Sequence, residues 1–129
     1  MSITMMILTL AAVVVLWRGW QAPSPAEVPK VLATYARGEI SMALVVEPSA
    51  TLTEAGLRTT MLRACEGRDV CLVGVWDSDA LAPRSVMMSE EQARAMLYSY
   101  ALNRYFGDDR GLWNCRLFPE VPRDRCFNR

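Results

Sequence analysis

The hydrophobic and polar positions divide the 129-residue chain into an apolar leader and a longer segment of mixed character. Fifteen residues from Ile3 to Trp17 follow one another without a charge, and the first charged side chain is Arg18. A helix of that length spans about 22 Å, and extending it to Trp20 approaches the roughly twenty residues that cross a bilayer. The pattern predicts that residues 1–22 are a transmembrane anchor or a signal peptide.

The residues that flank the leader favour an anchor over a cleaved signal. Trp17 and Trp20 suit the interfacial layer of a membrane, where Arg18 between them can extend to lipid head groups. No basic side chain precedes the apolar run, and the Ser-Pro-Ala sequence at 24–26 is only a tolerable cleavage site. A Pro-rich linker over 23–27 then leads into the rest of the chain.

The segment 28–129 has the size and patterning of one small domain. Apolar residues at helical spacing predict a helix over 26–37 that Gly38 ends. The apolar run 40–46 is rich in β-branched residues and is closed by a Glu-Pro-Ser sequence, so it predicts a buried strand.

The middle of the chain predicts a helix between two parallel strands. A capping box at 51–54 and a glycine at Gly67 bound a predicted helix over 52–66, with Leu57 among its core residues. The apolar run 70–76 follows as a second strand. Because a strand-helix-strand unit makes a right-handed crossover, the two strands should be parallel.

The last third of the chain predicts one more helix and a possible third strand. A second capping box, at 89–92, begins a helical pattern that reaches Gly107. Residues 111–118 can form the third strand, after which prolines prevent regular structure. The expected fold is therefore an α/β or α+β domain with a βαβ unit.

All four cysteines lie beyond the leader. An even number of cysteines next to an export signal predicts two disulfides and an oxidising compartment. We expect Cys65 to pair with Cys71, which ties the end of a helix to the next strand, and Cys115 to pair with Cys126, which holds the tail. The spacings match neither a zinc site nor a C-x-x-C redox site, so no metal is expected.

Composition and charge exclude several function classes. Fourteen basic residues balance fourteen acidic ones without a basic stripe, so nucleic acid is not an expected partner. Histidine is absent, which removes the commonest general base and metal ligand. No phosphate-binding loop or nucleophile motif occurs, and we expect neither a cofactor nor an enzyme.

Two groups of residues are candidates for binding. If the parallel strands hold a ligand, it should lie beyond their carboxyl ends, where Trp76, Asp77, Asp79 and Arg84 occur. The two aspartates are equally typical of a turn, and the tryptophan of a core. Aromatic side chains near the end of the chain, Tyr98, Tyr105 and Trp113, have the composition of a protein interface, although a core uses the same residues.

Three hypotheses about function follow. The first is a membrane-anchored, non-catalytic accessory domain on the periplasmic or extracellular side, with a protein partner in an envelope assembly. The second is a ligand-binding module that is secreted or periplasmic after leader cleavage. The third is a small hydrolase that uses Asp77 and Asp79.

Overall fold

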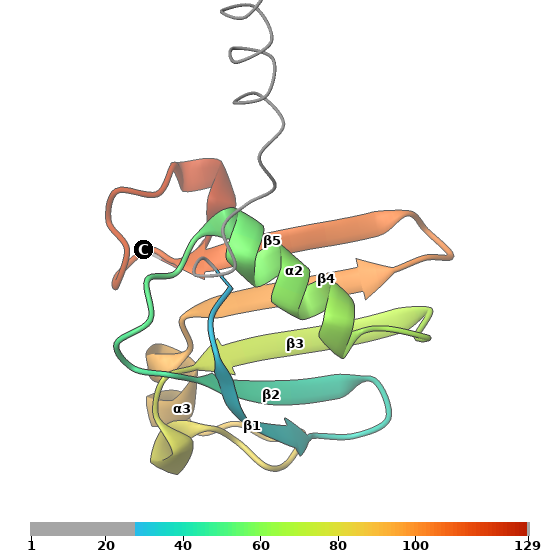
Figure 1. Cartoon of the computed structure of the whole chain (residues 1–129), viewed down its shortest axis with the longest axis horizontal. Coiled ribbons are helices and arrows are strands. Elements are labelled where there is room, and N and C mark those ends of the chain that lie inside the picture. Colours follow the sequence, from blue (N-terminus) through green and yellow to red (C-terminus); the bar gives the residue numbers. More distant parts are fainter. Residues whose placement is uncertain (1–27, 129) are drawn as a thin grey trace, which may run out of the picture.

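A computed structural model describes residues 28–128, which form a six-stranded mixed sheet with flanking helices (Figure 1). The predicted anchor, with Trp17, Arg18 and Trp20, and the linker 23–27 lie outside the described residues. Within the described part, no helix has both the length and the apolar character needed to cross a membrane. In sheet order, which is also chain order, the strands are β1 (Val31–Ala36), β2 (Ser41–Val46), β3 (Val70–Trp76), β4 (Tyr98–Asn103), β5 (Asp108–Asn114) and β6 (Cys126–Asn128).

The predicted strand-helix-strand unit is confirmed. β2 and β3 are parallel, and α2 (Glu54–Ala64) connects them. The helix begins later than predicted, because Thr53 rather than Thr51 is its N-cap and accepts a 3.0 Å hydrogen bond from the Gly56 amide. Gly67 follows the helix with φ of 75°, a left-handed conformation that glycine adopts without strain.

The helix predicted over 26–37 is wrong, because this segment contains β1. The strand pairs antiparallel with β2, so that Tyr35 lies opposite Ala43 and Thr34 lies opposite Leu44. β-Branched and aromatic residues favour a pleated surface, and the buried strand β2 needs a hydrogen-bonding partner on this side. These tertiary demands outweigh the helical spacing of the apolar residues.

The second capping box is confirmed, but the long helix predicted after it is wrong. Ser89 accepts a hydrogen bond from the Gln92 amide and donates its own amide to the Gln92 side chain, yet α3 covers only Glu90–Ala95. The chain continues as β4, in which buried and partly buried residues alternate, and β4 pairs antiparallel with β3. The strand predicted at 111–118 is β5, which begins earlier and ends at Asn114.

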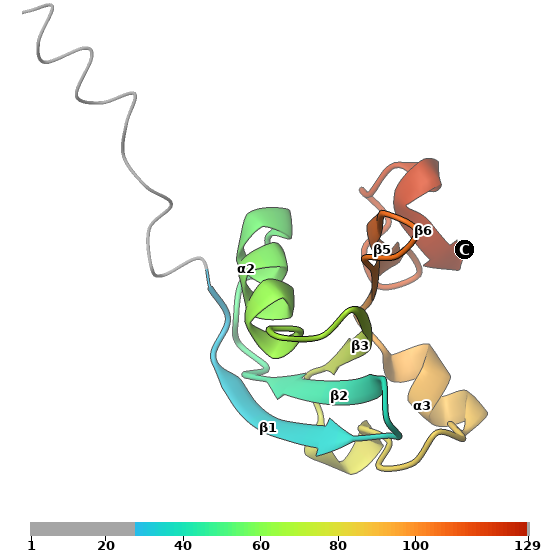
Figure 2. The same ribbon diagram turned by 90° about the vertical axis from the view of Figure 1, so that its right-hand side faces the viewer.

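The sheet bends around α2 and carries a separate core on each face. Figure 2 shows α2 on the inner side of the bend and α3 on the outer side. The larger core packs α2 residues such as Leu57 and Met61 against β2 to β5. The smaller core lies around Trp76 and Ala82, under α3 and the short helix η2 (Asp79–Leu81).

Both predicted disulfides are confirmed. Cys65 bonds to Cys71 with their Cα atoms 5.8 Å apart, and Cys115 bonds to Cys126 with a Cα separation of 5.5 Å. The first joins the end of α2 to β3, and the second joins β5 to β6 through the last loop. The fold is thus a small mixed α/β domain with two disulfide bonds.

Candidate interaction surface

The residues predicted to hold a ligand beyond β3 lie in different environments. Trp76 is fully buried, and its Nε1 donates to the Gln92 carbonyl oxygen at 2.8 Å. Its ring covers Gly74, where a Cβ atom would come within 2.5 Å of the ring carbons. Asp77 is exposed and lines a small hollow near Leu97 that Asp79 does not line. Trp76 therefore belongs to the core, and Asp77 lies beside a hollow to which Asp79 does not contribute.

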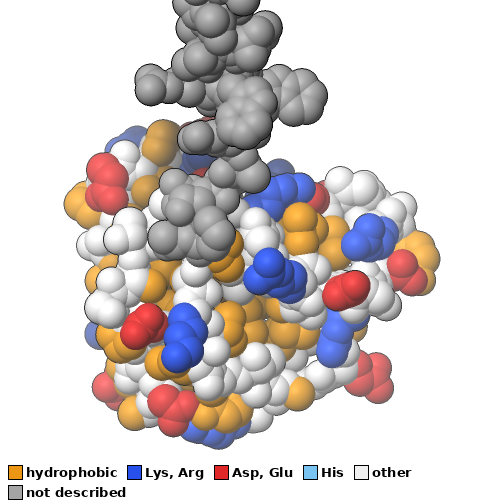
Figure 3. Space-filling view, viewed as in Figure 1, with side chains coloured by type: hydrophobic (Ala, Val, Ile, Leu, Met, Phe, Trp, Pro, Cys, Tyr) orange, Lys and Arg blue, Asp and Glu red, His pale blue; other side chains and the backbone are white. Residues whose placement is uncertain are grey.

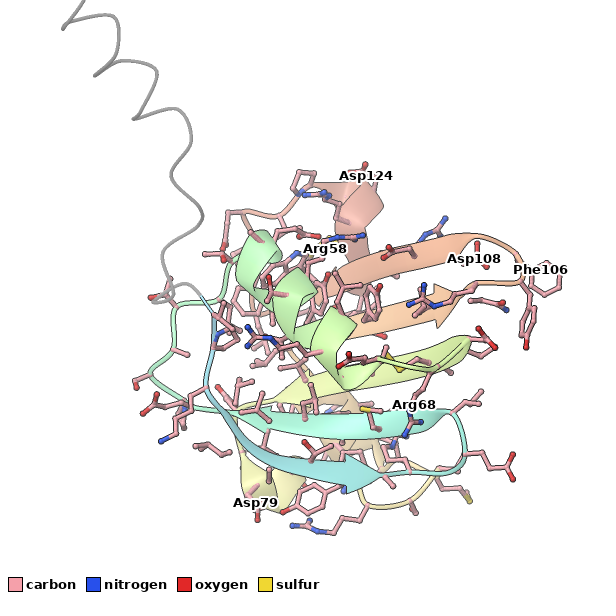
Figure 4. All side chains as sticks on the ribbon, turned by 45° about the vertical axis from the view of Figure 1, so that its right-hand side comes forward. Arg58, Arg68, Asp79, Phe106, Asp108 and Asp124 are labelled. Carbon is pink, nitrogen blue, oxygen red and sulfur yellow. A yellow bond between two sulfur atoms is a disulfide. The ribbon has the colours of Figure 1, made fainter. Side chains whose placement is uncertain are left out.

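Asp79 and Arg84 instead meet at a tyrosine of β1. The Asp79 carboxylate accepts hydrogen bonds from the Tyr35 hydroxyl and, at 3.1 Å, from Arg84 Nη2. The Arg84 guanidinium also lies 4.1 Å from the centre of the Tyr35 ring. These contacts tie the loop after β3 to β1, and Figure 4 shows Asp79 at this side of the domain. The side chains of Asp79 and Arg84, which the sequence predicted to bind a ligand, are therefore already hydrogen-bonded within the domain.

Two of the three predicted interface aromatics are core residues. Tyr98 and Trp113 are almost completely buried, and their rings meet edge to face with centroids 5.1 Å apart. Trp113 Nε1 donates to the Glu54 carboxylate at 2.8 Å. Burial and the nearby Glu54 carboxylate raise the pKa of the Tyr98 hydroxyl. Buried side chains offer no contact area to a partner, so these two residues fix the start of α2 against β5.

A second polar bridge joins α2 to β5 further along the helix. Arg58 donates two hydrogen bonds to the Asp109 carboxylate, at 3.0 and 2.6 Å, and Tyr100 donates a third at 2.7 Å. The hydrogen bond from Arg58 is the main cause that lowers the pKa of Asp109. Burial raises the pKa of Tyr100 to about 12. At neutral pH, the bridge is therefore a charged carboxylate held by protonated donors.

The third predicted interface residue, Tyr105, belongs to an exposed apolar surface at one end of the sheet. Four connecting segments meet there: the β1–β2 turn (37–40), the α2–β3 turn (66–69), the loop 83–88 and the β4–β5 turn (104–107). We call these segments together the loop end. Six of the ten large hydrophobic side chains that the described residues expose lie on or beside them: Ile40, Leu72, Val86, Met87, Tyr105 and Phe106.

Hydrogen bonds hold the four segments of the loop end together. Asp69 accepts from the Arg104 amide at 2.8 Å and, through its carboxylate, from the Tyr105 hydroxyl at 3.1 Å. Arg68 donates to the carbonyl oxygen of Glu39 at 3.2 Å, which links the α2–β3 turn to the β1–β2 turn. Figure 4 shows Arg68 at this end of the domain and Phe106 beyond the end of the β4–β5 hairpin.

Arg37 attaches the loop 83–88 to this end. Its side chain is nearly buried and donates to the carbonyl oxygens of Ser85 and Val86, both at 3.0 Å. Gly38 follows with φ of 138°, and a Cβ atom there would lie 3.0 Å from Val86. The loop is therefore fixed although its tip is exposed, with Met87 87% accessible.

A shallow groove of about 390 Å³ runs from the loop end onto the sheet face beside α3. Leu72 and Gly74 of β3 form part of its floor, and Met88 and Met96 form part of its wall. The groove and the exposed turns lie at the same end of the sheet, together with charged side chains of both signs. The charged rim residues are Glu39, Glu66, Arg68, Asp69, Arg104 and Asp108.

The sequence itself contains one indication of this exposed surface. Val86 and Met87 lie in a segment that follows a proline and precedes a helix cap, where polar residues are usual. Large apolar residues in a predicted loop indicate either a buried loop or a binding surface. Ile40 and Leu72 carried no such signal, because each is part of an apolar run that predicts a buried strand.

Comparisons of the chain with models of known protein families, with curated proteins and with solved structures gave no match. In residues 28–128 no group of three or more histidine, cysteine or acidic side chains is placed to hold a metal ion.

Proposed function

We propose that this chain is a non-catalytic interaction domain that binds a partner protein through its loop end. The observation that carries the proposal is the concentration of six exposed, large hydrophobic side chains on four hydrogen-bonded turns. Exposed apolar area costs about 25 cal/mol per Å², and continuous exposed patches on a soluble domain usually mark an interaction site. The mixed-charge rim has the character of the edge of a protein interface.

The fixed geometry of the loop end supports this proposal further. Arg37 and Asp69 hold the turns by hydrogen bonds, so the backbone of the turns loses little freedom when a partner binds. Phe106 and Met87 are the most exposed hydrophobic residues and suit the role of anchors in pockets of a partner. Removing such an anchor typically costs about 2 kcal/mol or more, roughly a thirty-fold loss of affinity.

The setting that we propose is the periplasmic or outer side of a membrane, with the leader as a retained anchor. Two disulfides in a small domain support the oxidising compartment, and the uncharged run from Ile3 to Trp17 supports the anchor. The intact mass of protein from isolated membranes tests it. Full-length mass with four alkylatable thiols only after reduction is expected. A shortened mass indicates a cleaved leader, and free thiols before reduction contradict an oxidising compartment.

Site-directed photo-crosslinking in the producing cells tests the proposed partner surface. A photoreactive phenylalanine analogue replaces Phe106 or Met87, and the matched control carries it at Leu117, which is also exposed but lies outside the loop end. We expect one partner protein to be captured from both test positions and not from the control. Equal capture at all three positions, or none from the loop end, contradicts the proposal.

Substitution then measures how much the anchors contribute. Phe106→Ser and Met87→Ser should each weaken the captured complex by about tenfold or more, whereas Leu117→Ser should leave it unchanged. All three variants should keep both disulfides and the wild-type circular dichroism, because none of these side chains is buried. If the complex survives Phe106→Ser and Met87→Ser combined, the loop end is not its interface.

A small-ligand module is the second candidate, and the groove beside α3 is the observation that favours it. Its volume of about 390 Å³ and its Leu and Met lining are typical of a site for a small apolar molecule. Met96→Trp should fill the groove and abolish ligand binding while leaving crosslinking from Phe106 intact. Crosslinking that disappears in the Met96→Trp variant contradicts a separate ligand site.

A further inference from the structure

β1 forms an open edge of the sheet. It is the outermost strand, and none of its six residues from Val31 to Ala36 is charged or a proline. The opposite edge strand, β6, has only three residues, one of which, Cys126, is bonded to Cys115 directly after the neighbouring strand β5. Among the described strands, β1 is therefore the long edge that can accept another strand.

The hydrogen-bond pattern shows which main-chain groups of β1 face outwards. The amide of Arg37 donates to the carbonyl oxygen of Ser41, so this pair is a hydrogen-bonded one, and so are the alternate pairs that contain Tyr35 and Ala33. The residues between them, Thr34 and Ala36, must direct their N–H and C=O groups away from β2. Both residues are exposed. The edge thus presents four main-chain groups in regular spacing.

Natural sheets usually protect such an edge with charges, prolines or bulges. Here the protection is confined to one end, where Pro29 and Lys30 precede the strand and a register shift lies between Val31 and Ala33. From Ala33 onwards the pairing with β2 is regular. An unprotected, uncharged stretch of this kind is a template for strand addition.

We propose that β1 pairs antiparallel with β1 of a second copy of this chain. The pairing is independent of the loop end and of the function proposed for it. A two-fold axis at Tyr35 places Thr34 of one chain opposite Ala36 of the other, so that their outward main-chain groups pair and the two sheets become one. Since β1 carries no charge, no like charges meet along the shared strands.

Charges at the two ends of the strand favour a second copy over an unrelated strand. Lys30 precedes β1 and Glu39 follows it, and both side chains are exposed. In an antiparallel self-pairing, the end of β1 that follows Lys30 lies beside the partner subunit's β1–β2 turn, which carries the partner subunit's Glu39. The two-fold axis brings these opposite charges near each other at both ends of the joined strands.

The same axis brings two apolar hollows together. A hollow of about 570 Å³ lies between β1 and α2, with Val31, Leu44 and Ala64 in its lining. Figure 3 looks onto this face and shows hydrophobic side chains between basic ones. An axis perpendicular to the joined sheet keeps both α2 helices on one face, so the two hollows become neighbours. The exposed Leu32 then gains contact with the other chain.

Sedimentation equilibrium of the full-length protein in mild detergent, over a range of concentrations, tests the pairing. A reversible monomer–dimer equilibrium is expected. Thr34→Pro removes an N–H that the ladder with β2 does not use, and Thr34→Lys places like charges across the axis. Each should raise the dissociation constant about tenfold or more. Thr59→Lys, which adds the same charge at a partly exposed position of α2, should not change it.

Charge reversal tests the antiparallel arrangement. Lys30→Glu and Glu39→Lys should each weaken the dimer by about two- to thirty-fold at low salt, because each places like charges together twice. The double variant should regain wild-type affinity. Mixing the two single variants should also form heterodimers in preference to either homodimer. A parallel pairing, or an interface elsewhere, predicts neither the rescue nor the preference.

The outcomes separate this inference from the proposed function. If the protein stays monomeric, the proposed β1–β1 pairing is wrong, and the open edge of β1 can then pair only with a strand of another protein. A dimer that ignores all substitutions at Thr34, Lys30 and Glu39 overturns it in favour of another interface, such as the leader. Neither result affects crosslinking from Phe106, and loss of that crosslinking does not affect the dimer.

Discussion

Gly111 of β5 is the position where a single added methyl group should damage the fold most. The phenol of Tyr98 crosses β5 at this glycine, and a Cβ atom built there would lie 1.6 Å from Tyr98 Oη and 2.3 Å from Cζ. Because ordinary carbon contacts begin near 3.4 Å, alanine cannot be accommodated by small adjustments. Gly111→Ala must displace the tyrosine ring from the core.

The cost of this displacement follows from the contacts that the ring makes. The edge-to-face contact of Tyr98 with Trp113 contributes about 0.5–1.5 kcal/mol, and its long hydrogen bond to the Glu54 carboxylate about 1.5 kcal/mol. Forcing a side chain out of a packed core costs a further 1–3 kcal/mol or so. We therefore expect Gly111→Ala to lower the free energy of unfolding by about 3 to 6 kcal/mol.

Urea unfolding of the disulfide-intact protein in mild detergent measures this, with near-ultraviolet circular dichroism to follow the buried aromatic rings. Gly107→Ala in the same hairpin is the matched control. Gly107 has φ of 71° and nothing within 4 Å of an added Cβ, so that variant suffers only backbone strain of about 1–2 kcal/mol.

A double-mutant cycle isolates the steric term. In a Tyr98→Ala background the obstacle is gone, and Gly111→Ala should then cost less than about 0.5 kcal/mol. The reasoning is refuted if Gly111→Ala costs no more than Gly107→Ala, or if its cost is the same with and without the tyrosine ring.

Three further substitutions test other contacts. Hydrogen bonding from Arg58 lowers the pKa of Asp109, so the contact stabilises the fold above about pH 4 and the gain is lost as pH falls through the lowered pKa. Asp109→Asn should therefore reduce stability by less than about 1 kcal/mol at neutral pH and by progressively less as pH falls below about 4, and a pH-independent difference in urea midpoints would contradict this. Replacing Cys115 and Cys126 together by serine should cost about 3 kcal/mol in the same assay, and an unchanged midpoint would show that the bond adds no stability. Arg37→Lys loses a two-point contact, so amide hydrogen exchange should quicken in the loop that Arg37 holds and not in α2; unchanged exchange in that loop would refute the anchoring role.

Local patterns predicted β2, α2 and β3 because each pattern there agrees with what the tertiary structure needs. They failed where two periodicities overlap. From α3 into β4, Ala93, Met96 and Tyr100 follow a helical spacing, while Tyr98, Tyr100 and Leu102 alternate as in a strand. The buried strand β3 needs a hydrogen-bonding partner on this side, and because residues 98–103 supply it, they form the strand β4 rather than a helix.

The disulfide pairing was predictable for a geometric reason, whereas the exposed surface was not. Cys65 ends a helix and Cys71 begins the following strand, so a short turn brings them together whatever the rest of the fold does. Whether Tyr98 or Tyr105 is exposed depends on where α2 packs, and α2 is contributed by a distant part of the chain. Composition therefore identified an aromatic group but could not say which members face the solvent.

The identity of strand order and chain order has a consequence for how the domain is made. A chain that emerges N-terminus first, from the ribosome or across a membrane, adds each new strand to one that has already emerged. The two disulfides likewise join consecutive cysteines, six and eleven residues apart, so each cysteine meets its own partner before any later one is available. Biogenesis of this domain then needs an oxidant that closes thiol pairs in order, and no enzyme that reshuffles them.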